Sequence, residues 1–353
     1  MMKSQFVSLL AVIVLFAGSL TNGPTRAQTE NNKGMGVVTG SSAGTYIQFG
    51  RDMATVAESQ GLQLWVKESQ GSLANIRRLV SRENAAMGIV QSDVLGFLSR
   101  SEDPKMRHVA TRLRLIFPFY NEEVHVFARK DIERFEDLQG KRVVVGTKGS
   151  GNWLTATNLL HMMGVEPAER LSMDPVAAAT AVLTDKADAM FYVAGKPVKL
   201  FTNIEQMAQN PDYHGFLDQV HLVPLSDSKM LEEYVQATLA ATDYAWLTED
   251  VPTVAVKAVL VAYDFSSKNV PYYRFRCEQL GRLGTAVRDN ISELQRNGHP
   301  KWQQVNLNEE VGIWERDTCS QTEPVKVVES SETEDDFLIR GLEECIRTGK
   351  CRE

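Results

Sequence analysis

The chain has 353 residues, of which 43% are hydrophobic and 24% are charged. These values are average for a soluble globular protein, so they exclude a disordered chain and a membrane bundle. The length is enough for two ordinary domains, each with a buried core. The formal net charge of −7 argues against a surface that binds nucleic acid or an anionic membrane.

Residues 1–27 have the three-part pattern of a secretory signal. Lys3 gives a basic start, residues 6–17 are an almost unbroken apolar run, and residues 25–27 (Thr-Arg-Ala) have the small side chains that a signal peptidase recognises. A retained membrane anchor is the alternative, but the run is short for a bilayer. Removing residues 1–27 takes away Lys3 and Arg26 and no acidic residue, so the net charge becomes −9. We therefore expect a protein exported to the periplasm and cleaved after about Ala27.

Short β-type runs and helical stretches alternate from Gly36 onward, which is typical of an α/β fold. In the first half we expect strands at 36–39, 62–66, 86–90, 113–119 and 124–128, with helices at 46–59, 72–82 and from 93 to 99. The pattern then restarts with strands at 141–146, 189–193, 220–225 and 253–263, and helices at 153–163, 176–184, 197–207 and 273–296.

These elements form two similar βαβα units, which predict two lobes. Lobe I comprises residues 34–124 and 260–312, and lobe II comprises residues 125–259. Extended segments near 123–128 and 253–261 are placed to cross between the lobes, and the second returns the chain to lobe I. A hinged pair of lobes with a cleft between them follows. Residues 313–353 are expected to be an acidic, cysteine-containing extension whose charges are mostly solvated.

All four cysteines lie in the last quarter of the chain, and export makes disulfides permissible. Four cysteines allow three pairings. We favour Cys277–Cys319 and Cys345–Cys351, because the last two cysteines flank a short turn. A zinc site is disfavoured, because the Cys-x5-Cys spacing has no histidine nearby.

Two loops rich in glycine and hydroxyl groups each follow a strand and open a helix. They are residues 39–46 (Thr-Gly-Ser-Ser-Ala-Gly-Thr-Tyr) and residues 146–153 (Gly-Thr-Lys-Gly-Ser-Gly-Asn-Trp). Backbone N–H groups at a helix N-terminus attract anions. Neither loop has a nucleotide-binding spacing. Because ligands lie beyond the carboxyl ends of strands in α/β sheets, the two loops could hold a carboxylate from both sides of a cleft.

Further polar and aromatic residues fall near other strand ends. Ser72 and Asp93 are candidates for the cleft, with simple helix capping as the alternative. Aromatic side chains that could line a pocket are Tyr46, Phe119, Tyr120, Trp153 and Tyr192. No hydrolase or zinc-protease motif is present, and His125 sits among apolar neighbours as a packed or hydrogen-bonded histidine would. We therefore expect no catalytic residue, no metal and no cofactor.

At these loops the sequence resembles the TAXI family of TRAP-transporter solute receptors. The stretches that carry the likeness are Gly44-Thr45-Tyr46, Ser69-Gln70-Gly71-Ser72-Leu73-Ala74-Asn75, Gln91-Ser92-Asp93, Glu122-Glu123-Val124-His125-Val126, residues 137–143, Gly149-Ser150-Gly151, residues 191–198 and residues 249–256. They occur in order from about residue 36 to residue 263. The chain departs from the family's pattern at Lys148 and Lys196, which occupy positions that are often uncharged, and in its acidic end.

The resemblance implies a type II periplasmic-binding fold that closes around a solute, often an acidic amino acid or another organic carboxylate. The solute would be delivered to a TRAP-type membrane permease. Carried over position by position, the pocket residues are Gly44, Thr45, Tyr46, Ser72, Gln91, Ser92, Gly149, Ser150 and Tyr192.

We add Lys148 as a cation that selects a dianionic ligand, with Lys196 as a weaker candidate and a solvated rim lysine as the alternative for both. Two other functions stay open: an exported hydrolase or transferase on a similar two-lobed fold, and a ligand-sensing receptor for a membrane signalling protein.

Overall fold

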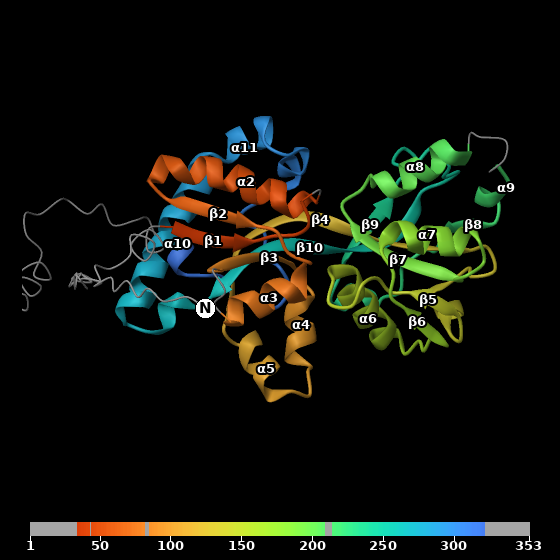
Figure 1. Cartoon of the computed structure of the whole chain (residues 1–353), viewed down its shortest axis with the longest axis horizontal. Coiled ribbons are helices and arrows are strands. Elements are labelled where there is room, and N and C mark those ends of the chain that lie inside the picture. Colours follow the sequence, from red (N-terminus) through yellow and green to blue (C-terminus); the bar gives the residue numbers. More distant parts are fainter. Residues whose placement is uncertain (1–33, 43, 82–84, 209–213, 322–353) are drawn as a thin grey trace, which may run out of the picture. The chain divides into compact units, whose positions relative to one another are not determined.

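The computed structural model describes residues 34–321 apart from 43, 82–84 and 209–213 (Figure 1). The chain divides into two units, residues 1–34 and 35–353, and the architecture below is that of the second. The expected signal peptide and the expected pair Cys345–Cys351 lie outside the described residues. Within those residues, no helix has the length and apolar character needed to cross a bilayer.

Lobe I is built from both ends of the described chain. Its elements from the N-terminal side are β1 (Gly34–Val38), α2 (Thr45–Ala57), η1 (Glu58–Gln60), β2 (Gln63–Lys67), α3 (Ser72–Ser81), β3 (Met87–Gln91), α4 (Val94–Ser99), α5 (Pro104–Ala110) and most of β4 (Leu113–Arg129). Later elements return to it: the end of β10 (Val251–Tyr263), η5 (Phe265–Ser267), α10 (Pro271–Asp289), α11 (Ile291–Asn297) and η6 (Pro300–Gln304). Helices α2 and α10 lie on one side of its sheet and α3 lies on the other (Figure 1).

Lobe II repeats the alternation of strand and helix. Its elements are the end of β4, η2 (Phe135–Leu138), β5 (Arg142–Val144), α6 (Gly151–Met163), β6 (Glu169–Leu171), α7 (Pro175–Leu183), β7 (Ala189–Ala194), α8 (Lys199–Ala208), α9 (His214–Leu217), β8 (Val220–Leu222), η4 (Met230–Glu232), β9 (Val235–Leu239) and most of β10. Side chains of α6 pack into one buried cluster and side chains of α7 and α8 pack into another, so the lobe II sheet is also covered on both faces.

The same strand order occurs in both lobes. The sheet runs β2-β1-β3-β10-β4-β7-β5-β6, with β8 on β4 and β9 on β10. In lobe I the order is β2-β1-β3 and then β10, and in lobe II it is β6-β5-β7 and then β4. The last strand of each order is long and is shared with the other lobe: β3 pairs antiparallel with β10, and β7 pairs antiparallel with β4. Two shared crossover strands and this order are the topology of the type II periplasmic-binding fold. The predicted fold class is therefore confirmed.

The structure departs from the expected elements in three ways. The strands expected at 113–119 and 124–128 are the single strand β4, which contains Pro118. In lobe I β4 is the last strand in the order, so it is an edge strand. An edge strand tolerates proline, because the N–H that proline lacks is not needed to pair with a further strand. The helix expected at 273–296 is broken at Asn290, whose side-chain amide donates to the Ala286 carbonyl 2.8 Å away and so competes with helical bonding. Short elements α5, β6 and β9 were not expected.

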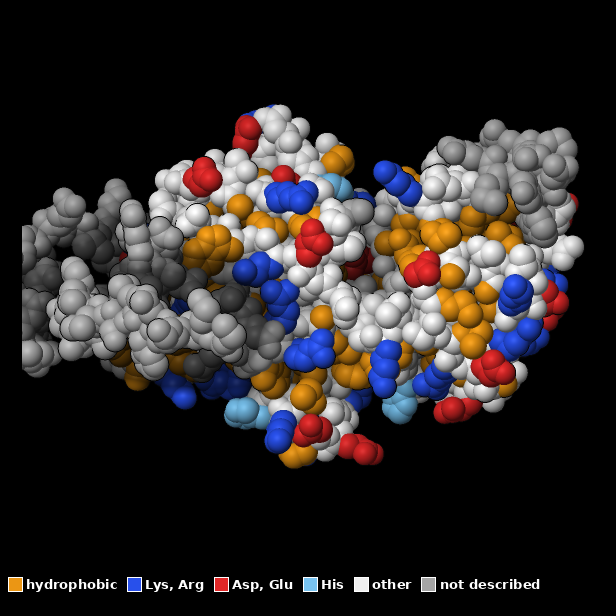
Figure 2. All heavy atoms as spheres, viewed as in Figure 1, with side chains coloured by type: hydrophobic (Ala, Val, Ile, Leu, Met, Phe, Trp, Pro, Cys, Tyr) orange, Lys and Arg blue, Asp and Glu red, His pale blue; other side chains and the backbone are white. Residues whose placement is uncertain are grey.

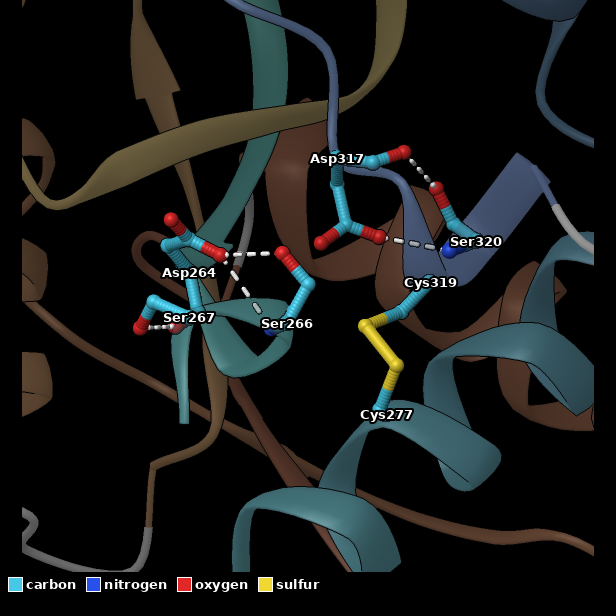
Figure 3. The surroundings of a disulfide bond; sticks show 7 residues. All are labelled: Asp264, Ser266, Ser267, Cys277, Asp317, Cys319 and Ser320. Atoms are coloured by element: carbon cyan, nitrogen blue, oxygen red, sulfur yellow. Dashed lines mark hydrogen bonds between the residues drawn. A yellow bond between two sulfur atoms is a disulfide. The ribbon is translucent and has the colours of Figure 1, made fainter. Parts of the chain in front are cut away.

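The C-terminal segment packs back onto lobe I. The Cys277 and Cys319 sulfur atoms are bonded in the structure, which ties η7 (Cys319–Gln321) to α10 (Figure 3). Nearby, the Asp317 backbone N–H donates to the Leu115 carbonyl of β4 at 2.8 Å. Residues 313–321 of the expected extension therefore contact the lobe I sheet and do not form a separate unit.

Candidate functional site

A cleft of about 830 Å³ lies between the lobes and is lined by residues of both. Figure 2 shows the surface hollowed between the region of α2 and the region of α8. This volume is in the range of small-molecule pockets. The cleft is therefore the candidate ligand site.

The N-termini of two helices, one from each lobe, meet at this cleft. Gly44 precedes α2 and Ser150 precedes α6, and both residues line the cleft. The Ser150 hydroxyl accepts a bond from the Trp153 N–H at 3.2 Å, which caps α6. The loops approach closely: a Cβ added to Gly71 of lobe I would lie 3.5 Å from the Gly151 backbone nitrogen of lobe II, and Gly71 has a φ of +106°. The positive φ favours glycine at position 71, and the distance is that of an ordinary van der Waals contact between the lobes.

The structure brings seven of the ten predicted binding residues to the cleft: Gly44, Thr45, Tyr46, Ser72, Gln91, Ser150 and Tyr192. Ser92, Lys148 and Gly149 do not line it. The Ser92 hydroxyl accepts from the Lys257 N–H at 3.1 Å, and the Lys148 N–H donates to Ser172 Oγ at 3.3 Å from an exposed turn. The ligand contacts of all ten residues stay a prediction.

Glu122 is a cleft residue that sequence reasoning did not single out as a binding group. It lies in β4 next to the crossover, is 7% exposed, and lines the cleft. Its Oε2 accepts from the Tyr46 hydroxyl at 2.9 Å, and its Oε1 lies 3.5 Å from the Tyr120 hydroxyl. Burial raises the pKa of this carboxyl to about 7, against the lowering effect of the Tyr46 bond. The sequence feature that could have identified Glu122 is the acidic pair Glu122-Glu123 inside a largely apolar strand.

Lys301, from η6, is a second cleft residue that the sequence did not indicate. Its Nζ donates to the Lys196 carbonyl at 2.8 Å and lies 6.0 Å from the centre of the Tyr120 ring. Loss of solvent lowers the pKa of Lys301. The side chain of Lys196 itself is engaged elsewhere, since its Nζ pairs with Asp243 at 2.8 Å. Lys301 is thus a cation of lobe I that touches the backbone of lobe II inside the cleft.

A buried polar cluster joins the lobes beside the cleft. Asp93 Oδ2 accepts from the hydroxyls of Thr155 and Tyr234 at 2.8 and 3.1 Å, and lies 3.4 Å from the Asn158 amide nitrogen. Burial raises the pKa of Asp93 to about 6. The capping alternative for Asp93 does not hold, because its side chain makes no cap bond to α4. Asp93 instead connects lobe I to lobe II.

His125 is a fully buried residue of β4 and does not line the cleft. Its Nε2 is 2.8 Å from the Tyr244 hydroxyl, and its Nδ1 is 3.0 Å from the Glu123 carbonyl oxygen. The neutral ring can donate from one nitrogen and accept at the other. These contacts fit the expected structural histidine. Within the described residues, no group of three or more His, Cys, Asp or Glu side chains is arranged to hold a metal ion.

We expect the His125 ring to stay neutral down to about pH 5, because burial lowers its pKa to about 4. The unfolded chain binds this proton near pH 6.5. The contribution of His125 to the free energy of unfolding is therefore fully present above pH ~6.5 and is lost as the pH falls towards 4. NMR titration of the imidazole nitrogens measures the pKa directly. Protonation above pH 6 would contradict the structural assignment.

Three solved structures are similar to this chain at low identity. A histidine kinase sensor domain with similarity to periplasmic binding proteins has 12% identity and a TM-score of 0.42, over 78% of this chain and 98% of that one. The periplasmic binding protein BugD has 14% identity and a TM-score of 0.43, over 78% and 89%. A substrate-binding protein of an ABC uptake transporter from Streptococcus pneumoniae, with bound histidine, has 12% identity and a TM-score of 0.43, over 78% and 95%. At the sequence level, the model of the NMT1-like family matches residues 37–274.

Proposed function

This chain belongs to the NMT1-like family, and we propose that it is an extracytoplasmic solute-binding protein that captures a small organic carboxylate in the interlobe cleft. The observation that carries the proposal is the meeting of the α2 and α6 N-termini at one cavity. Each N-terminus stabilises an anion by ~0.3–1 kcal/mol, or by ~2 kcal/mol in a partly buried setting. Micromolar capture requires about 8 kcal/mol in total. Further hydrogen bonds from the polar cleft lining supply the rest.

Binding without chemistry is the proposed mechanism. A carboxylate that contacts both helix N-termini interacts with both lobes at once, so it favours the arrangement in which the lobes are together. Only a ligand with different affinities for the two arrangements can shift their balance. We further propose delivery to a TRAP-type permease, as a TAXI receptor, on the basis of the motifs from Gly44 to Val256. Ligand uptake into vesicles that hold such a permease would then require this protein.

Native mass spectrometry of the freshly purified protein tests the proposal. The expected result is one small carboxylate per chain, lost on denaturation. Titration of the stripped protein with that acid then gives a dissociation constant. A preparation that neither carries nor binds a small carboxylate would overturn the proposal.

A negative charge placed at the α2 N-terminus should weaken carboxylate binding at least about tenfold, which corresponds to ~1.4 kcal/mol. Thr45→Glu is the suitable change, because Thr45 lines the cleft and acidic residues are favourable in a first helical turn. Val176→Glu is the matched control: it adds the same charge to the first turn of α7, at a position that is 66% exposed and outside the cleft lining. Calorimetric titration should find normal affinity in the control. Equal affinities in both variants would exclude the α2 N-terminus as an anion site.

A further inference from the structure

The cleft holds an acidic group that capture of an anion does not explain. Glu122 is almost fully buried and lies on the cleft lining that a carboxylate ligand must approach. Two carboxylates in one site repel each other, and burial makes an uncompensated charge costly. A ligand that carries only negative charge would therefore be opposed at this position when Glu122 is ionised.

Glu122 retains room for another hydrogen-bond donor. The Tyr46 hydroxyl donates to Oε2 at 2.9 Å, whereas the Tyr120 hydroxyl is 3.5 Å from Oε1, at the limit of a hydrogen bond. The Gln91 side chain is a third hydrogen-bond partner of Glu122. An ionised carboxylate offers about four acceptor sites. The capacity that remains suits an N–H group from a ligand, and a charged N–H group makes the stronger bond.

A cation lies in the same cleft. Three lysines line it among the described residues: Lys196, Lys199 and Lys301. Lys196 is paired with Asp243, and Lys199 is exposed. Lys301 uses one N–H on the Lys196 carbonyl and lies over the Tyr120 ring, whose hydroxyl faces Glu122. An ammonium has three donors, so Lys301 can also donate to a carboxylate.

We propose that the cleft selects a small zwitterion, with Glu122 recognising a protonated nitrogen of the ligand and Lys301 its carboxylate. The proposal rests on carboxylate capture as the proposed function and narrows its ligand class from any small organic acid to one with an ammonium group. Lys148, expected to favour a dianion, is outside the cleft lining.

The protonation of Glu122 provides a second measurement. Because burial raises its pKa to about 7, the carboxyl loses its proton as the pH rises from 6 to 8, and only the ionised form pairs with an ammonium. Affinity for the zwitterion should rise over this range.

The titratable and polar groups that face Glu122 or bear on its charge are Tyr46, Gln91, Asp93, Tyr120, Glu123, Tyr192 and Lys301.

The experiment compares acids that differ only in the nitrogen: L-glutamate with glutarate, and L-leucine with 4-methylpentanoate. Wild type should bind one amine-bearing acid at least about tenfold more tightly than its deamino partner. Glu122→Gln should abolish that preference and the rise of affinity with pH, and Glu122→Asp should restore part of both. Lys301→Met should weaken both members of the pair, whereas Lys186→Met, at an exposed lysine outside the cleft lining, should not.

Glu123→Gln is the matched control for Glu122→Gln. Glu123 is the next residue in β4, accepts from the Lys196 N–H at 2.8 Å, and does not line the cleft, but its charge acts on Lys301. Because Lys301 would bind the carboxylate that both acids of a pair share, Glu123→Gln should change their affinities together and keep the wild-type preference. If the deamino acids bind as tightly as their partners, the zwitterion inference is wrong while carboxylate capture stands. If none of the four acids binds to the wild type and the freshly purified protein carries no small carboxylate, the inference and the proposed function both fail.

Discussion

Trp302→Ala should lower the free energy of unfolding by about 3–5 kcal/mol, the usual cost of deleting a buried tryptophan. Trp302 is fully buried in lobe I, where its ring stacks on Phe49 with centroids 4.3 Å apart and meets Phe119 edge-on. Its Nε1 donates to Asp52 Oδ2 at 2.8 Å. Because Lys301 precedes it in η6, the same change should loosen Lys301 and weaken carboxylate binding. Urea unfolding and calorimetric titration measure the two effects.

Trp302→Phe separates packing from hydrogen bonding. It keeps an aromatic ring against Phe49 but removes the donor to Asp52, which still accepts from the His299 N–H at 2.8 Å. Because Asp52 is not left without a bond, the loss should be about 1–2 kcal/mol. A Trp302→Ala variant with stability within about 1 kcal/mol of wild type would show that η6 is not anchored by this ring.

The sequence predicted the parts of the fold that depend on local pattern. Alternating strand and helix runs indicated two similar units, and the shared strands β4 and β10 follow from long β-type runs at their junctions. The loops at 40–46 and 146–153 were identifiable because glycine and hydroxyl residues directly follow strands. The fold rules for α/β sheets then placed these loops at a common cleft.

The parts that depend on distant contacts were not predictable in this way. Lys301 reaches the cleft from a segment in which Trp302 packs onto Phe49, more than 250 positions earlier in the numbering. Asp93 has the sequence context of a helix cap, and its bonds to Thr155 and Tyr234 arise only when the lobes meet. Lys148 had the local signal of a ligand-binding loop, but its turn lies outside the cleft lining.

The bond between Cys277 and Cys319 provides a test that differs from Trp302→Ala in one respect: the stability should fall, but the affinity for the carboxylate should not. Replacing Cys277 and Cys319 with serine should lower the free energy of unfolding by about 2–4 kcal/mol, because the bond closes a long loop in the unfolded chain. The two cysteines are 42 positions apart and neither lines the cleft. Carboxylate affinity should therefore stay within about twofold of wild type.

Reductant is the control for the serine variant: it should lower the stability of wild type to that of the reduced variant, in which only the expected Cys345–Cys351 pair is left to break. Mass spectrometry of peptides from unreduced protein should recover Cys277 linked to Cys319. A link from either residue to Cys345 or Cys351 would show that one of the other two pairings forms. The segment from Trp302 to Cys319 would then be fixed by packing alone, and Trp302→Ala should cost more than the range given above.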